Sequence, residues 1–493
     1  MMQRWHYRQI AVGFLVVIVI GFSLGSSGDF GFAESRAIQS VTTLETSDAS
    51  LVPTVLQVFE GPDGGAPPDT EIAVSDRAIV TAVNHKLNVF NKQDGLEDIQ
   101  ILFTTFFPQA GVTGRDPYDP HIEYDAYNKK FLIVVGAKEL PGTDGYIGLI
   151  VGRTAYPSNQ SDWCATKVYL PSENIEIFVD YPGMSINPIT DLVFLTANVY
   201  DTQGTADRVD DTALGARVIK MKLSDVYSCP SFIPYKITPP TRLPNTVCGN
   251  AECFAESLHP AQWLDGFTSP NSYLMSHYLS TTGQGTSLYL WNLENTYASD
   301  REILLDEVSY AYEKAPGIRQ INGQTLLMVN SPLISHAYQK NDTIYAVHDV
   351  KHPTAANAAV VIHQRPLDLS VLGTSLIRSH PTRDYAFQAM MLDQANHVAV
   401  GFSQTDTADP TINNAIMLSG ITNDRIMVQE SLANQQAAGG APRGGDYSDA
   451  FLDPNGIDMW FINAYTGPNR GWRTKIMRVS FFSTRVFLPW TTR

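Results

Sequence analysis

Short apolar runs separated by turn residues fill the chain after residue 50. The runs are rich in Val, Ile, Phe, Tyr and Thr, and Gly, Pro, Asn and Asp interrupt them, which is typical of β-strands joined by tight turns. Long stretches of helical periodicity are scarce. We therefore predict an all-β protein.

The strand pattern also repeats along the chain. Each unit opens with a polar residue, usually an acid, runs through alternating apolar positions to a second Asp or Asn, turns, and enters a longer apolar strand, as in DPHIEYDAYNKKFLIVVGA. The units begin at Asp69, Asp119, Asp180, His259, Asp384 and Asp446, and a degenerate unit lies within residues 315–350. Repeats of this length predict a β-propeller, most simply one of seven four-stranded blades. Six or eight blades follow if the degenerate unit is misread.

A polar residue recurs at the first turn of most units. Asp and Asn side chains at such turns cap their own backbone, so a structural role is expected for Asp76, Asp125, Asn187, Asp265, Asp393 and Asp453.

The two ends of the repeat region are predicted to share one blade. The strand-like LVPTVLQVFE near residue 51 is expected to pair with the closing segment RTKIMRVSFF and so to lock the ring. Residues 51–493 are thus predicted to form a single propeller domain, with 34–50 as a polar leader. Residues 205–225 and the Gln-, Ala- and Gly-rich residues 433–445 are expected to be loops.

The first residues have the pattern of an export signal. Arg4 and Arg8 precede an apolar run from Ile10 to Leu24, and small residues lead to Ala33. This pattern predicts a signal peptide over residues 1–33 and a secreted, periplasmic or cell-surface protein. An uncleaved membrane anchor is the alternative.

Four cysteines are consistent with an oxidising compartment. Cys248 and Cys253 bracket the short segment CGNAEC and form the natural disulfide pair, which leaves Cys164 with Cys229. Free thiols are the alternative, and the spacing does not match the usual paired zinc motif.

The composition excludes one class of partner. The hydrophobic share of 44% with 17% charged residues indicates a globular protein with a large core. The net charge of −16, with no basic run after the first ten residues, argues against nucleic-acid binding.

In a propeller the inner strands start at the same end of the central channel, so the residues that open the units are predicted to converge there. A ring of carboxylates repels itself unless a cation, arginines or hydrogen-bond donors compensate it. Oxygen ligands suit calcium, and the candidate calcium ligands are Asp119, Asp180, Asp384 and Asp446. Pairing with arginines and capping of backbone amides are the alternatives.

Arginines and tyrosines accompany these acids. Arg115, Arg319, Arg383 and Arg443 lie next to or within strand starts, and Tyr181, Tyr385 and Tyr447 directly follow the acids. Such groups either bridge adjacent blades or present aromatic rings to a sugar or peptide. We include all of them, with the residues that open the units, in a candidate ligand-binding channel mouth.

Three segments resemble a known family. RGGDYSDAFLDPNGIDMWFINAYTGPNRGWRTKIMRVSF, RDYAFQAMMLDQANHVAVGFSQ and DPHIEYDAYNKKFLIVV are similar to secreted bacterial β-propellers with sialidase-like (BNR-type) repeats. The resemblance covers most of the chain after residue 65 and implies propeller architecture. The sequence has neither an S-x-D-x-G-x-x-W Asp-box nor an Arg-Ile-Pro segment near the start of the fold.

Common catalytic motifs are missing from the sequence. It has no nucleophile elbow, phosphate-binding glycine loop, H-E-x-x-H helix or dinucleotide fingerprint, and the histidines at 336, 348, 352 and 363 form no recognisable metal motif. The leading hypothesis is a secreted binding protein with a ligand or cation site at the channel mouth, its partner a glycan, a peptide or another protein. The alternative is a sialidase-like glycan hydrolase or lyase, which needs two catalytic groups about 5 to 10 Å apart in an open cleft.

Overall fold

The structure is a computed structural model that describes Arg36–Ala37 and most of residues 53–482. The segments of 53–482 outside the description are 64–66, 109–116, 139–144, 171–175, 204–210, 240, 242, 244–253, 265–270, 280–283, 294–296, 298–301, 320–324, 327–333, 353, 370–372, 381, 407–414, 420–424, 430–445 and 468–471. The predicted signal peptide lies outside the described residues and stays a prediction. No helix of the described part is long and apolar enough to cross a membrane.

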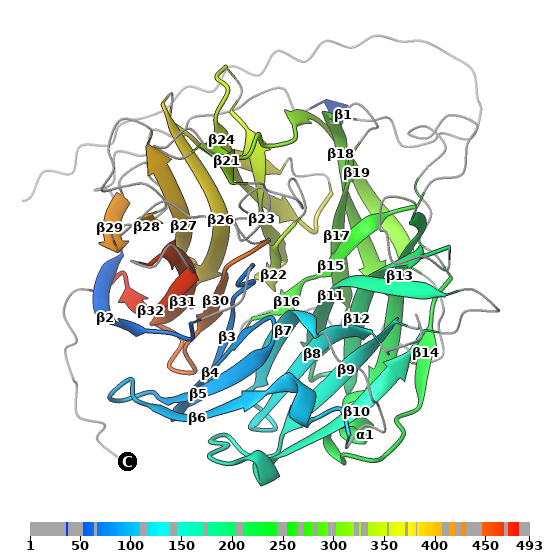
Figure 1. Cartoon of the computed structure of the whole chain (residues 1–493). Helices are drawn as coiled ribbons and strands as arrows, with labels where there is room; N and C mark the ends of the chain where they lie inside the picture. The colour runs from blue at the N-terminus through cyan, green and yellow to red at the C-terminus, as the bar shows by residue number, and fades with distance from the viewer. Residues whose placement is uncertain are drawn as a thin grey trace, which may run out of the picture. The chain divides into compact units, whose positions relative to one another are not determined.

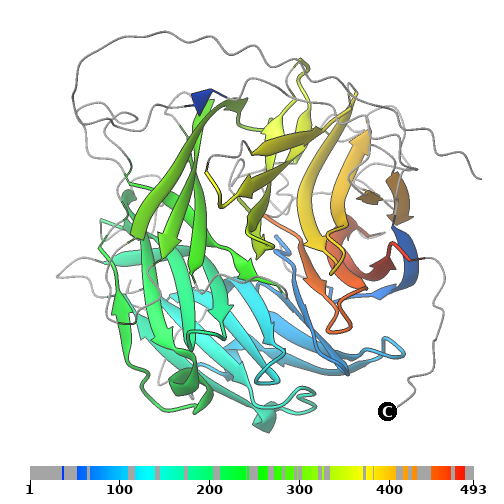
Figure 2. The same cartoon turned by 180° about the vertical axis from the view of Figure 1, so that it is seen from behind.

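The described strands form seven blades, each an antiparallel sheet of four strands arranged around a central axis (Figures 1 and 2). Blade 1 consists of β3 (Glu71–Val74), β4 (Ala78–Val83), β5 (Lys86–Asn91) and β6 (Glu97–Leu102), and blade 2 of β7 (Tyr118–Asp125), β8 (Lys130–Lys138), β9 (Gly145–Gly152) and β10 (Trp163–Tyr169). Blade 3 consists of β11 (Ile177–Asn187), β12 (Leu192–Asp201), β13 (Thr212–Lys222) and β14 (Tyr235–Ile237), and blade 4 of β15 (Glu256–Pro260), β17 (Ser272–Leu279), β18 (Gln284–Leu293) and β19 (Glu302–Glu313). Blade 5 consists of β22 (His336–Lys340), β23 (Thr343–Lys351), β24 (Ala358–Pro366) and β25 (Thr374–Arg378), and blade 6 of β26 (Arg383–Leu392), β27 (Val398–Asp406), β28 (Ala415–Ser419) and β29 (Arg425–Gln429). Blade 7 consists of β30 (Asp449–Leu452), β31 (Met459–Thr466), β32 (Trp472–Ser480) and the N-terminal strand β2 (Thr54–Glu60). The prediction of a seven-bladed, all-β propeller is confirmed.

A few short elements accompany the blades. β1 (Arg36–Ala37) pairs in parallel with β19, and β16 (Gln262–Trp263) pairs in parallel with β22. The remaining elements are the hairpin of β20 (Ile318–Arg319) and β21 (Thr325–Leu326), the helix α1 (Leu223–Tyr227), and the 3₁₀ turns Phe103–Thr105 and Gln160–Asp162. Because β16 follows the inner strand of blade 4 and joins that of blade 5, it ties these two blades together near the axis.

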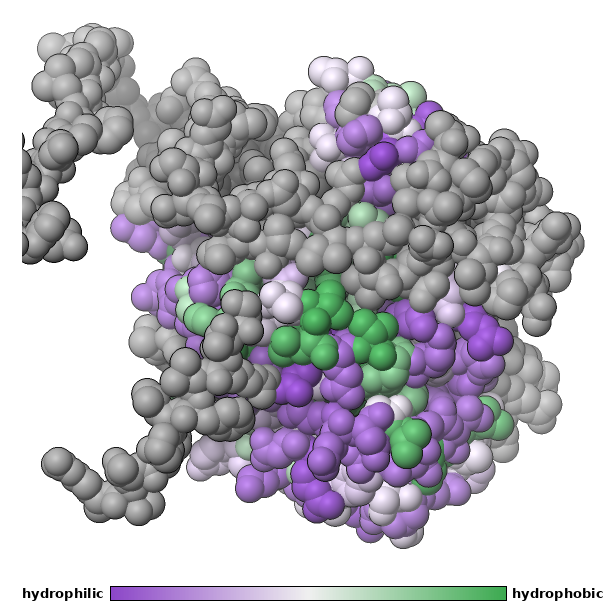
Figure 3. Space-filling view, turned by 90° about the vertical axis from the view of Figure 1, so that its left-hand side faces the viewer, coloured by the Kyte–Doolittle hydropathy of each residue, from purple (hydrophilic) through white to green (hydrophobic). Residues whose placement is uncertain are grey.

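The ring closes through the N-terminal strand. β2 pairs antiparallel with β32, with Val55 opposite Val479 and Glu60 opposite Lys475, which confirms the predicted pairing. Alternate residues of β2 face outward, and Leu56 and Val58 are each 41% exposed. Figure 3, which views the side that carries β2 and β29, shows an apolar patch within a largely polar surface.

The apolar core lies between neighbouring blades. Leu149 of β9 and Leu195 of β12 belong to one buried cluster that spans blades 2 and 3. Val360, Met390 and Phe461 belong to another that spans blades 5, 6 and 7. Each sheet therefore buries both faces, as a propeller requires.

Most of the predicted turn caps are present. Backbone amides donate to the side chains of Asp125, Asn187, Asp393 and Asp453 in their own turns. In blade 1 the prediction of Asp76 is off by one residue, since the hydroxyl of Ser75 accepts from the amides of residues 77 and 78. Asp265 lies outside the described residues.

One loop prediction is wrong. Residues 205–225 contain β13, the third strand of blade 3, and most of α1. The residues from Thr212 to Lys222 pair with β12, and the apolar positions from Leu214 onward make them a strand of the blade. Residues 433–445 lie outside the described part.

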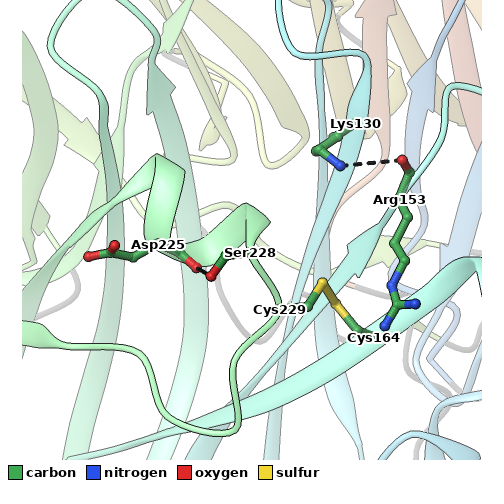
Figure 4. The surroundings of a disulfide bond; sticks show 6 residues. All are labelled: Lys130, Arg153, Cys164, Asp225, Ser228 and Cys229. Atoms are coloured by element: carbon green, nitrogen blue, oxygen red, sulfur yellow. Dashed lines mark hydrogen bonds between the residues drawn. A yellow bond between two sulfur atoms is a disulfide. The ribbon is translucent and has the colours of Figure 1, made fainter.

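A disulfide links two blades. Cys164 of β10 in blade 2 is bonded to Cys229, which follows α1 in blade 3 (Figure 4), as predicted. A disulfide is compatible with an extracellular location. Cys248 and Cys253 lie outside the described residues, so their pairing stays a prediction.

Candidate functional site

A repeated β-bulge shapes the start of the inner strands. The pairing register shifts within β7, β11, β15 and β26, and each shift contains one residue with a positive φ. These residues are Asp119 (φ 49), Tyr181 (φ 51), Ser257 (φ 52) and Phe387 (φ 52), and Asp69 (φ 40) has the same backbone conformation just before β3. Bulges of this kind re-aim the side chains that follow.

Two layers of polar side chains result. We call Asp69, Asp119, Asp180 and Asp446 the mouth layer. We call Glu71, His121, Glu123, His259, His336 and Asp449 the axial layer. Glu71 and His121 each follow a mouth acid by two residues on the same strand, so the two layers lie about 6 to 7 Å apart along the strands.

The mouth layer brings together acids from different blades. Carboxylate oxygens of Asp69, Asp119 and Asp446 lie within 4.8 Å of one another. The backbone amide of Asp446 donates to Asp69 (2.7 Å), as does the side-chain amide of Asn84 (2.6 Å). The backbone amide of Tyr181 donates to Asp119 (3.2 Å). The expected capping of backbone amides is thus present in this layer.

The convergence of these acids changes their electrostatics. Burial raises the pKa of Asp119 well above its usual value, and the negative charges of Asp180, Asp69 and Asp446 raise it further. Asp69 is fully buried, and Asp119 is 6% exposed. The carboxyl groups of the mouth layer can therefore all be ionised together only if a positive charge compensates their repulsion.

Asp384 does not belong to the same group. Both of its carboxylate oxygens accept from Arg319, whose side-chain Nε lies 2.9 Å away, and one also accepts from the amide of Ala358. Arg383 instead pairs with Asp406 at 2.9 Å. Arg115 and Arg443 lie outside the described residues. Of the two predicted roles for the arginines, pairing with carboxylates is therefore the one seen for Arg319 and Arg383.

The three candidate tyrosines are buried. The hydroxyl of Tyr181 donates to the carbonyl of Ile334, and that of Tyr447 donates to the carbonyl of Pro120. Their rings meet edge to face at 5.9 Å. Tyr385 packs on Phe402 with ring centroids 4.8 Å apart. These rings are 3% to 7% exposed, so they pack the interior and offer no stacking platform.

The axial layer contains a histidine between two carboxylates. Nδ1 of His121 lies 3.1 Å from Glu71, and its Nε2 lies 3.6 Å from Glu123. Burial alone would lower the pKa of His121, but Glu71 and Glu123 together raise it well above its usual value. Burial raises the pKa of Glu71 to about 8 and that of Glu123 to about 7, although His121 lowers both. These three side chains share protons and must be treated as one unit.

A second group in the axial layer joins blades 1, 5 and 7. Glu71, His336 and Asp449 each place one potential ligand atom within 4.8 Å of the others. Nε2 of His336 lies 2.9 Å from Oδ1 of Asp449. The three residues are at most 2% exposed.

His259 lies beside this group, one layer deeper than its predicted place at the mouth. Its ring centroid is 6.0 Å from that of His336 and 5.9 Å from that of His121. Burial lowers the pKa of His259 well below its usual value, and charges on His121 and His336 lower it further. The residue equivalent to Asp69 and Asp119 in blade 4 is Ser257.

Most of the axial layer was not predicted from the sequence. Glu71, His121, Glu123 and Asp449 were not among the predicted site residues, and His336 was set aside. A signal was present in the first two units, where Glu71 and His121 each lie two positions after the acid that opens the unit. In blade 4 this signal is displaced, because His259 corresponds to His121 and not to the acids that open the other units.

The comparisons with known proteins concern the fold. No protein-family model matches the sequence, and no curated protein matches it. Among solved structures, the endosialidase of phage phi92 is similar over 89% of this chain and 70% of its own, with 7% identity and a TM-score of 0.44. The Dos1 propeller covers 83% of this chain and 76% of its own, with 9% identity and a TM-score of 0.38. An α-L-arabinanase of Cellvibrio cellulosa covers 63% and 95%, with 12% identity and a TM-score of 0.35.

Proposed function

We propose that this protein is a cation-binding β-propeller of the extracellular space, with Asp69, Asp119, Asp180 and Asp446 holding a hard divalent cation of the calcium class. The observation that carries the proposal is the approach of three carboxylate oxygens, from blades 1, 2 and 7, to within 4.8 Å of one another. Calcium prefers six to eight oxygen ligands, and carboxylates and backbone carbonyls supply them in most proteins.

The burial of the layer favours an ion over an organic ligand. Asp69 is fully buried and Asp119 is 6% exposed, while Asp180 and Asp446 are half-buried, so a sugar or peptide could contact only the latter two. A monatomic ion needs only the oxygen atoms. Asp384 is left out of the proposed ligand set because Arg319 already occupies both of its oxygens.

A bound cation would stabilise the ring at its closing blade. Asp446 precedes β30 of blade 7, while Asp69 precedes β3 of blade 1. An ion shared by these residues crosses the junction at which the two ends of the propeller meet. The ring would then be most stable where calcium is abundant, as it is outside cells.

The test is a melting curve of the full chain with calcium and with excess chelator. Calcium at about 100 times its Kd should stabilise the fold by about 2.7 kcal/mol. In Asp119→Asn the amide oxygen still accepts from Tyr181, so the fold is kept while the calcium shift is lost. The exposed Asp94→Asn serves as the charge-matched control. An equal melting temperature of the wild type with and without calcium would rule the proposal out.

Glycan hydrolysis is the second candidate. The observation in its favour is that Glu71 and Glu123, with pKa values of about 8 and about 7, have the raised values that general acids need. Both carboxyl groups are buried, so the substrate would require an opening of the channel. Sialylated and arabinose-containing oligosaccharides are the substrates to screen. Lack of product from both classes would remove these two substrates as candidates.

A further inference from the structure

The group of Glu71, His336 and Asp449 differs chemically from the mouth layer. It contains an imidazole as well as two carboxylates, contributed by β3, β22 and β30. Imidazole nitrogen is a preferred ligand of zinc and other first-row transition metals, whereas calcium prefers oxygen alone. The two layers are therefore suited to different ions.

The geometry of His336 is unusual for a hydrogen-bonded histidine. Its Nε2 lies 2.9 Å from Oδ1 of Asp449, yet neither ring nitrogen has a hydrogen-bond partner. The two atoms are close without being aligned on each other. Ligand atoms about 2.1 Å from a common ion lie about 3.0 Å apart at a right angle and about 3.4 Å apart at the tetrahedral angle, each aimed at the ion and not at its neighbour. The 2.9 Å contact lies at the short end of this range.

The carboxylates of the group are held in place by the neighbouring blades. Oδ2 of Asp449 accepts from the backbone amide of Ile72 (2.8 Å), and Oε2 of Glu71 accepts from that of Ile122 (3.2 Å). Nδ1 of His121 also lies 3.1 Å from Glu71. Partners of this kind orient metal ligands and adjust their basicity. The carboxylates therefore resist reorientation, which is what a pre-organised metal site requires.

His259 supplies an independent observation. It is 3% exposed, and neither of its ring nitrogens has a hydrogen-bond partner. Burial of a polar group without a partner is unfavourable, because the group has lost its hydrogen bonds to water. Its ring lies 6.0 Å from that of His336 and 5.9 Å from that of His121, centroid to centroid. An ion bound beside His336 would give His259 the partner that it lacks.

We infer that the axial layer binds a first-row divalent transition metal ion of the zinc class, with Glu71, His336 and Asp449 as ligands and His259 as the fourth. The site lies on the propeller axis and joins blades 1, 4, 5 and 7. It shares no residue with the proposed calcium site.

The test uses the full chain, stripped with chelator and then titrated with cobalt(II), whose ligand-field absorption reports coordination by nitrogen and oxygen. One cobalt ion per chain should bind, and zinc should displace it while calcium does not. His336→Gln should weaken cobalt binding by at least about 100-fold. The control is His352→Gln, which changes a histidine whose Nδ1 accepts from the amide of Thr354 in its own turn. Far-ultraviolet circular dichroism establishes that each variant is folded.

Two further measurements keep the result unambiguous. Asp119→Asn should leave cobalt affinity unchanged, so failure of the calcium proposal does not affect this one. If His336→Gln does not fold, His259→Gln takes its place, and it should alter the cobalt spectrum and lower the affinity. The inference is overturned if the stripped wild type binds no cobalt. It is also overturned if the axial histidine variants bind cobalt as the control does, or if Asp119→Asn abolishes binding.

Discussion

The carboxylate of Asp449 in blade 7 accepts a hydrogen bond from the backbone amide of Ile72 in blade 1, at 2.8 Å. Glu71 of blade 1 does the same for Ile122 of blade 2 at 3.2 Å, and Asp119 of blade 2 for Tyr181 of blade 3 at 3.2 Å. Three successive junctions of the ring are thus made by an acid of one inner strand and an amide of the next.

Asp449→Ala should destabilise the protein even without metal. The change removes the acceptor for Ile72 and leaves a buried amide without a partner, which costs about 2 kcal/mol. Urea unfolding in excess chelator measures this loss apart from any effect of an ion. Asp94→Ala, at an exposed turn, should change the free energy of unfolding by less than about 0.5 kcal/mol. Equal stability of the two variants would contradict the role given to Asp449.

The closing strand offers a matched pair of substitutions. Phe59 packs against Phe90 at 5.9 Å and against Trp460 at 6.2 Å, whereas its neighbour Val58 is 41% exposed. Phe59→Ala should lower the free energy of unfolding by about 2 kcal/mol because the side chain is half-buried. Val58→Ala should cost less than about 0.5 kcal/mol. Similar losses from the two would show that β2 does not hold the ring through packing on its inner side.

Removal of the described disulfide should lower stability. The bond closes a loop with a sequence separation of 65 residues, and bonds of this loop length stabilise by about 4 kcal/mol in the chain-entropy model. The variant with both Cys164→Ala and Cys229→Ala should melt at a lower temperature than the wild type. Reductant should lower the melting temperature of the wild type at least to that of this variant, since it would also break the predicted bond between Cys248 and Cys253. If the variant and the oxidised wild type melt together, the bond contributes no stability.

Acid should destabilise the protein through His348. Burial lowers the pKa of this histidine from 6.5 to about 4, and its Nε2 lies 2.8 Å from Nε2 of His363. The unfolded chain therefore takes up a proton below about pH 6.5 that the folded chain does not bind until about pH 4. The stability associated with the neutral ring is complete above pH 6.5 and is lost as the pH falls towards 4.

The measurement for His348 is the slope of unfolding free energy against pH. Between pH 6.5 and 4.5, the free energy of unfolding should fall less steeply in His348→Gln than in the wild type, by up to about 1.4 kcal/mol per pH unit. Buried acids such as Glu71, whose pKa is raised, increase the stability as the pH falls. They are present in both the wild type and His348→Gln, so their contribution cancels in the comparison. If His348→Gln keeps the wild-type slope, His348 is not the acid-sensitive group.

Local patterns were enough to predict the blades but not the site. The inner strands carry alternating apolar residues and a capped turn, and both are local signals that survive in nearly every unit. The bulge is different, because the positive φ of Tyr181, Ser257 and Phe387 depends on pairing with the next strand and has no fixed residue type. Because the bulge in β15 cannot be read from the sequence, His259 was predicted to lie with the acids of the mouth layer. The approach of Glu71 to His336 depends on ring closure across 265 positions of sequence, which no local pattern carries.

The position of β2 also constrains the order of folding. The strand that completes blade 7 lies more than 400 positions before its partner β32, so the ring cannot close until almost the whole chain has been synthesised. Contacts this distant in sequence make closure slow. Until then β32 presents an open edge, and strands with open edges pair readily with other chains. A cell that makes this protein must therefore keep β2 and the last blade apart from other copies until they meet each other.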